Sequence, residues 1–150
     1  ITMKKEQLDD TLEKLLESYE ANISDLNITP MCPFQVEYEG HLTAVDIKPS
    51  LRDNDKLLSP FQTASIVNLL IGKQERCWKI LKETGSCDLA YQLRKKARFR
   101  VNIFTRRGSY SIILRKLETI IPTLDSLQCP QIFKKVITEK TGLILVTGAT

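Results

Sequence analysis

The spacing of apolar and polar residues predicts a helix first and three strands after it. Apolar side chains recur at helical spacing within residues 4–20 and charged ones fill the other face, which predicts an amphipathic helix. Residues 23–28 are predicted to form a short strand. Apolar and polar residues then alternate over 34–38, and a tight turn at Glu39-Gly40 leads to a further strand at 41–47. These last two strands are predicted to form a hairpin.

Two helices and three strands are predicted next. A polar loop at 48–55 leads to Ser59-Pro60, where a hydroxyl cap precedes a proline at the first helical position. This helix is predicted to end near residue 71 and a second one to cover 73–83, each followed by a glycine. Strict alternation then predicts strands within 86–93, 98–104 and 109–117, with a turn at 106–108. In the middle strand Phe99, Val101 and Ile103 share one face, and Arg98, Arg100 and Asn102 share the other.

The sequence pattern changes near residue 120 from that of an α+β domain to that of an α/β domain. Up to residue 117 the order of elements predicts an α+β domain, with an antiparallel sheet and flanking helices. Residues 118–124 lose the periodicity and contain Pro122, which favours a semi-stiff linker. Pro130 then opens a predicted helix that leads to an apolar strand at 143–146, an order typical of a parallel α/β sheet. The predicted organisation is therefore a domain at 1–117, a linker at 118–129 and the start of a second domain at 130–150.

Composition narrows the function classes. The 150 residues are 42% hydrophobic and 27% charged, and no apolar run approaches the ~20 residues of a membrane span. Four cysteines without a C-x-x-C pair favour reduced thiols over disulfides or a zinc site. His41 is the only histidine, which excludes a Ser-His-Asp triad or a histidine-based metal cluster. The net charge of +4 favours an anionic partner, which could be a nucleotide, a nucleic acid or a lipid head group.

The chain ends on TGLILVTGAT, which suggests nucleotide chemistry. An apolar run passes through Thr147 into Gly148, Ala149 and Thr150. This is typical of a buried strand that leads into a phosphate loop of the form G-x-x-x-x-G-K-S/T. Only the first glycine of that loop and two more residues are present, so an ordinary strand end stays open as the alternative.

Four segments in order resemble one family. They are ISDLNIT at 23–29, KARFRVNIF at 96–104, IPTLDSL at 121–127 and GLILVTGAT at 142–150. Together they resemble the PilT-like branch of the type II/type IV secretion ATPases, the twitching-motility motors. The resemblance implies a PAS-like amino-terminal domain followed by the first helix and strand of a RecA-like ATPase domain, truncated within the Walker A loop at Gly148, Ala149 and Thr150.

The resemblance also implies a biological setting. The full-length protein would be a P-loop ATPase that uses ATP and Mg²⁺ and powers type IV pilus retraction. It would form a homo-hexamer through its ATPase domain and dock on the inner-membrane pilus platform protein. It would be cytoplasmic and peripheral to the inner membrane, without direct membrane insertion and without a nucleic-acid partner. The present chain is expected to have no catalytic residue, no metal site and no cofactor of its own.

Three arginines are the candidate functional residues. In the family, basic residues of the amino-terminal domain approach the nucleotide held by another subunit, and the matching positions are Arg98, Arg100 and Arg115. A guanidinium is a planar, permanently charged fork suited to phosphoryl charge. The plainer interpretation is that these arginines only form the solvated face of their strands, as Arg106 and Arg107 are expected to be solvated at their turn.

Two other functions stay open. The basic segment RKKARFRVNIFTRR contains Phe99 and Phe104, and exposed basic and aromatic residues on a sheet can bind single-stranded nucleic acid. However, Phe99 shares a face with Val101 and Ile103, which predicts that it belongs to the core. The second alternative is a PAS-like ligand-sensing module, for which no residue marks a cofactor pocket.

Overall fold

The computed structural model describes residues 3–19, 23–45, 57–118 and 121–148. The chain divides into two compact units, Ile1–Thr119 and Ile120–Thr150, which are described separately below. The predicted strand residues 46–47 and the predicted loop at 48–55 lie outside the described residues, as do Ala149 and Thr150.

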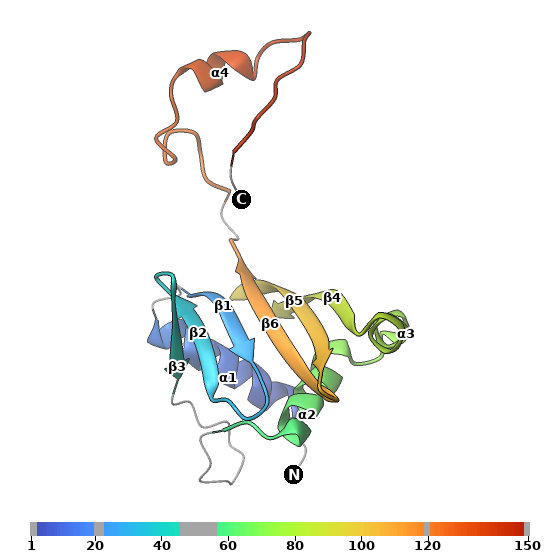
Figure 1. The fold of residues 1–150 in the computed structure, drawn as a ribbon. Helices are drawn as coiled ribbons and strands as arrows, with labels where there is room; N and C mark the ends of the chain where they lie inside the picture. The colour runs from blue at the N-terminus through green and yellow to red at the C-terminus, as the bar shows by residue number, and fades with distance from the viewer. Residues whose placement is uncertain (1–2, 20–22, 46–56, 119–120, 149–150) are drawn as a thin grey trace. The chain divides into compact units, whose positions relative to one another are not determined.

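The first unit is a mixed α and β fold built on one six-stranded antiparallel sheet (Figure 1). The strand order is β3-β2-β1-β6-β5-β4, so two three-stranded meanders are joined where β1 pairs with β6. The elements are α1 (Lys5–Ser18), β1 (Ile23–Ile28), β2 (Phe34–Tyr38), β3 (His41–Val45), α2 (Pro60–Ile71), α3 (Glu75–Thr84), β4 (Ser86–Leu93), β5 (Ala97–Arg106) and β6 (Ser109–Leu117). Each of these nine elements was predicted from the sequence pattern.

Local chemistry explains the ends of these elements. Helix α2 begins as predicted: the backbone N–H of Gln62 donates to the Ser59 hydroxyl at 3.2 Å, and the Gln62 side chain accepts from the Ser59 N–H at 2.6 Å. Strands β5 and β6 are joined by Arg107 and Gly108, both with positive φ, in the geometry of a two-residue hairpin turn that follows the twist of the strands.

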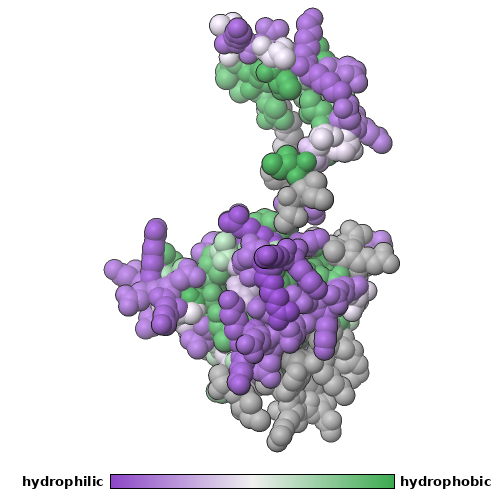
Figure 2. Space-filling view, turned by 180° about the vertical axis from the view of Figure 1, so that it is seen from behind, coloured by the Kyte–Doolittle hydropathy of each residue, from purple (hydrophilic) through white to green (hydrophobic). Residues whose placement is uncertain are grey.

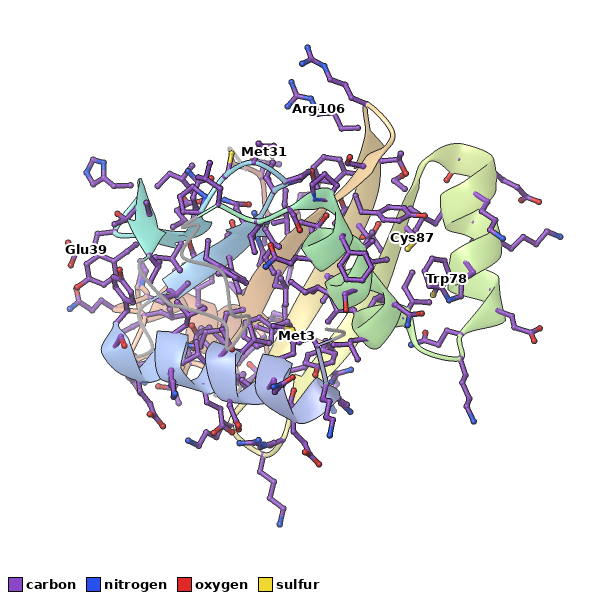
Figure 3. The ribbon with its side chains drawn as sticks, turned by 90° about the horizontal axis from the view of Figure 1, so that it is seen from below. Met3, Met31, Glu39, Trp78, Cys87 and Arg106 are labelled. Carbon is purple, nitrogen blue, oxygen red and sulfur yellow. The ribbon has the colours of Figure 1, made fainter. Side chains whose placement is uncertain are left out.

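The core lies on one face of the sheet. Helices α1 and α2 pack on this face, and α1 lies behind the strands in Figure 1 and below them in Figure 3. Helix α3 packs against the edge strand β4. Phe99, Val101 and Ile103 of β5 are all at most 2% exposed, as predicted from their shared face. Burial of such apolar side chains is the main favourable contribution to folding. The other face of the sheet carries no helix within residues 3–19, 23–45 and 57–118.

Polar contacts hold α1 against the turn between β4 and β5. The Tyr91 hydroxyl donates a hydrogen bond to the carboxylate of Asp9, and burial, together with this bond, raises the pKa of Tyr91. Arg94 and Lys96 at the turn form ion pairs with acids of α1. The pairs are Arg94–Asp10 at 2.6 Å, Arg94–Glu13 at 2.8 Å, Lys96–Glu13 at 3.3 Å and Lys96–Glu17 at 2.7 Å. Part of the basic segment before β5 is therefore already neutralised within the domain.

The second unit contains one helix, α4 (Ile132–Val136), within its described residues 121–148. A helix here was predicted. The segment 143–146, predicted as a strand of a parallel sheet, pairs with no described strand in this structure and has no regular secondary structure. A strand requires a neighbour to accept and donate its backbone hydrogen bonds, and sequence alternation cannot supply one. Hydrophobic side chains gather on the surface of this unit (Figure 2), and Leu143, Leu145 and Val146 are 76–86% exposed.

Candidate functional site

The strand register gathers the three candidate arginines on the open face of the sheet. On β5, Arg98 and Arg100 point away from the core, as predicted. Arg100 is the direct cross-strand partner of Arg115 on β6, and Arg98 is the partner of Leu117. Because directly opposed side chains in an antiparallel pair lie about 5 Å apart at Cβ, Arg100 and Arg115 are neighbours although they are 15 positions apart in sequence.

A hollow of about 340 Å³ lies on this face. It is lined by Asp88, Arg100, Asn102, Ile113 and Arg115, which come from β4, β5 and β6. Two of the three candidate arginines therefore line one concave site, and Arg98 does not line it. Two guanidinium groups beside a carboxylate and an amide give a polar site with donors for an anion.

Asp25 of β1 holds Arg115 in a bidentate ion pair. The Arg115 Nε donates to the Asp25 Oδ1 at 2.9 Å, and its Nη2 donates to Oδ2 at 3.0 Å. The Asp25 side chain is only 10% exposed, whereas that of Arg115 is 67% exposed. The hydrogen bonds to Asp25 raise the pKa of the Arg115 guanidinium. Arg115 is thus positioned by a nearly buried carboxylate, and its Nη1 group is left to donate elsewhere.

Asp25 was not predicted to be part of this site. It lies in the segment ISDLNI, whose alternation predicts the strand but not the strand that β1 would pair with. Only the β1–β6 pairing places Asp25 opposite Arg115. Side chains alternate between the two faces of a strand, and Leu26 and Ile28 point into the core. This alternation was the one signal in the sequence that Asp25 would lie on the opposite face of β1.

Arg100 and Arg98 are held less tightly than Arg115. The Arg100 Nε lies 3.4 Å from the Asp88 Oδ1, a single long contact between side chains that are 68% and 54% exposed. An exposed pair of this kind is weak and easily exchanged for another anion. Arg98 makes no ion pair or side-chain hydrogen bond within the part of the chain that the structure describes. Of the two guanidinium groups in the hollow, that of Arg100 is therefore the more weakly held.

The Arg115–Asp25 pair should contribute to stability, and the Arg98 side chain should not. Arg115→Gln leaves a nearly buried carboxylate without its cation, so we expect the melting temperature of the 150-residue chain to fall by several degrees. Arg98→Gln also removes one arginine charge, but from an exposed side chain, and should change the melting temperature by about 1 °C or less. Differential scanning calorimetry of the two variants tests this, and equal melting temperatures would show that the pair is not structural.

The other candidate residues contribute less to the site. Gly148 is described, is exposed and belongs to no helix or strand. Arg106 and Arg107 are exposed at the β5–β6 turn, as predicted. Phe99 is 2% exposed, so its ring belongs to the core rather than to a stacking surface. Among the described residues no group of three or more His, Cys, Asp or Glu side chains could hold a metal ion. None of the described helices is long and apolar enough to cross a membrane.

Comparison with known proteins shows that the chain is similar to part of the pilus ATPases. No family model matches the chain. Over 139 residues it is 37% identical to the type IV pilus ATPase PilU of Pseudomonas aeruginosa, which covers 92% of this chain and 34% of PilU. Over 141 residues it is 27% identical to the type IV pilus retraction ATPase PilT of the same organism, which covers 94% of this chain and 38% of PilT.

A solved structure agrees with these relatives. The fold superposes on the crystal structure of the pilus retraction motor PilT with bound ADP, with a TM-score of 0.71 and 31% sequence identity over 91% of this chain and 37% of that one. The chain is thus similar to the amino-terminal part of pilus ATPases and spans about a third of the length of the relatives it matches. Over this part it is similar to the PilT-like pilus and secretion ATPases.

Proposed function

We propose that the chain is the amino-terminal domain of a hexameric motor ATPase that powers type IV pilus retraction. In this proposal residues 1–117 form a PAS-like domain that covers and regulates the nucleotide bound by a neighbouring subunit. The observation that carries the proposal is the similarity to PilU and PilT, which extends over nine-tenths of this chain. The open face with its exposed Arg100 supports the more specific role across the subunit boundary.

The chemistry of that role follows from the arginine face. Bound ATP presents its phosphates as clustered negative oxygens, and the transferring phosphoryl group spreads its charge over three of them. Arg100 has a guanidinium that only a weak contact to Asp88 occupies, so it can turn to a phosphate at little cost. Arg115 can use Nη1 while Asp25 holds its other donors, and Arg98 adds positive charge nearby. These residues would bind and orient the nucleotide from outside its own subunit.

The second unit fits the beginning of the ATPase domain. Its exposed apolar residues would be covered by the rest of that domain, where 143–146 would become a strand of a RecA-like parallel sheet. Gly148, Ala149 and Thr150 would then open the phosphate loop of the Walker A motif, and ATP with Mg²⁺ would bind there in the full-length protein. Residues 118–129 would be the linker between the two domains.

The proposed cellular setting follows from the same relatives. The full-length protein would assemble as a homo-hexamer through its ATPase domain, in the cytoplasm, and would act at the inner-membrane pilus platform protein. It would be peripheral to the membrane and would have no nucleic-acid partner. The names of PilU and PilT describe a pilus ATPase and a pilus retraction ATPase, and they support this setting over that of a ligand-sensing module.

A pair of samples tests the proposal. The 150-residue chain should neither hydrolyse ATP nor bind ATP-Mg²⁺ with micromolar affinity, because the Gly-Lys-Ser/Thr part of the phosphate loop is not in it. The full-length protein should hydrolyse ATP and form hexamers. Isothermal titration calorimetry on the chain, and phosphate release with mass photometry on the full-length protein, provide the measurements. Micromolar binding by the chain, or a full-length protein without ATPase activity, would contradict the proposal.

A further inference from the structure

A second hollow lies at the end of the β5–β6 hairpin. It has a volume of about 380 Å³ and is lined by three stretches of the chain. The lining residues are Thr29, Pro30 and Met31 from the β1–β2 connection, Pro60 from the first turn of α2, and Arg106, Arg107, Ser109 and Ser111 from the hairpin. It shares no lining residue with the hollow of Arg100 and Arg115.

Two arginines give this hollow a positive charge that no described residue neutralises. Within residues 3–19, 23–45, 57–118 and 121–148, neither Arg106 nor Arg107 makes an ion pair or a side-chain hydrogen bond. Their backbone positions are nevertheless well defined, because Arg106 pairs with Ser109 across the hairpin and Arg107 occupies the left-handed turn before Gly108. Arg106 lies at the tip of the hairpin and projects away from the sheet in Figure 3.

The remaining lining is apolar or carries hydroxyl groups. Met31 is 66% exposed, and few other large apolar side chains of this domain are exposed. Its backbone is held in place, since its N–H donates to the carbonyl of Leu58 at 2.7 Å and the N–H of Leu58 donates to the carbonyl of Cys32 at 2.9 Å. A methionine side chain adapts its shape to different apolar partners. Ser111, which is 3% exposed, adds a hydroxyl to the hollow from β6.

We propose that this hollow binds an acidic segment of a protein partner. A glutamate or aspartate carboxylate of the segment would accept hydrogen bonds from Arg106 and Arg107, and an adjacent apolar side chain would pack on Met31 and Pro60. Arginine pairs with carboxylates in a bidentate manner, which gives both affinity and orientation. The inference concerns a surface separate from the arginine face and does not depend on the proposed motor function.

The lining favours a peptide over other anionic partners. None of the described residues that line the hollow is aromatic, whereas proteins that bind single-stranded nucleic acid use aromatic rings to stack the bases. A membrane surface attracts clusters of four or more basic residues, and only two of the described residues that line this site are basic. Two cations, an exposed methionine and a hollow of this volume suit one charged side chain with an apolar neighbour.

The test is a titration of the ¹⁵N-labelled 150-residue chain with the acetylated, amidated peptide Gly-Glu-Leu-Glu-Phe-Glu-Gly. We expect saturable amide shifts confined to residues 29, 31, 61, 62 and 105–111, with a Kd of about 1 mM or tighter. Arg106→Gln with Arg107→Gln should weaken binding about tenfold or more, since it removes the charge-assisted hydrogen bonds. Met31→Ala should weaken it about threefold through lost apolar contact.

Matched controls make the result decisive. Lys73→Gln with Arg76→Gln removes the same charge from exposed positions around the start of α3 and should change Kd less than about twofold. The peptide with glutamine in place of glutamate should not bind. No saturable shifts up to about 5 mM peptide, an equal effect of the control variant, or shifts centred elsewhere would overturn the proposal. A stronger response of the same amides to inorganic phosphate, an oligonucleotide or phosphatidylglycerol vesicles would also overturn it.

Discussion

Replacing Arg100 by alanine in the full-length protein is expected to lower ATP hydrolysis about 10- to 100-fold. Arginine fingers that contact the transferring phosphate directly contribute about 10³–10⁵-fold. A contact made by a domain that moves relative to the active site should contribute less, which sets the smaller expectation. Arg100 is the sharpest test of the proposed function because its weak contact to Asp88 makes no large contribution to the fold. The melting temperature of the variant should therefore stay close to that of the wild type.

Arg115 and Arg98 separate catalysis from stability in the same assay. Arg115→Ala should also lower hydrolysis, but part of its effect should come from the unpaired Asp25 and should appear as a loss of thermal stability. The Arg115 side chain faces solvent, as expected, but the carboxylate of Asp25 that it pairs with is nearly buried. Arg98→Ala should keep the wild-type stability and should lower hydrolysis less than Arg100→Ala, because Arg98 lies outside the hollow.

Mixed rings show whether Arg100 acts between subunits. Subunits with Arg100→Ala would be combined with subunits that lack their own Walker lysine, and mixing would be verified with two fluorescent labels. If the arginine acts on the nucleotide of a neighbour, some interfaces pair an intact arginine with an intact phosphate loop, and activity should partly return. Verified mixing without any recovery would mean that Arg100 acts within its own subunit or only supports the fold.

Phe99→Ala is expected to cost about 3–5 kcal/mol of unfolding free energy, which is a large part of the stability of a domain this size. Phe99 is 2% exposed and lies on the core face of β5, so its removal leaves a cavity beneath the sheet. Urea denaturation followed by circular dichroism measures the change. Phe104→Ala is the matched control, because Phe104 lies on the same strand but on the open face and is only partly buried. Its cost should be about 1 kcal/mol.

The same two variants address the nucleic-acid alternative. That function needs both rings to be available for stacking, and the structure places only Phe104 on the open face. We expect no salt-sensitive binding of a fluorescent oligonucleotide to the wild-type chain. Measurable binding that Phe104→Ala abolished without unfolding the domain would favour the nucleic-acid function over the one proposed here.

The sequence by itself determined the local structure of this protein. Alternation over 98–104 separated the core residues of β5 from its arginines, because side chains in a strand point alternately to the two faces. Ser59-Pro60 marked the start of α2, because capping depends on residues three positions apart. The order of ARFRVN and the other three segments indicated the PilT-like family. All of this information lies within short stretches of chain.

Tertiary structure alone decided which of these elements meet. Asp25 and Arg115 are 90 positions apart, and only the pairing of β1 with β6 brings them together. The same holds for Met31 and Arg106, which line one hollow from different connections. The segment 143–146 shows the converse, since its apolar pattern predicts a strand and no described strand pairs with it. Side-chain periodicity follows from the backbone of a single segment, whereas strand pairing depends on distant segments whose backbone groups must satisfy one another.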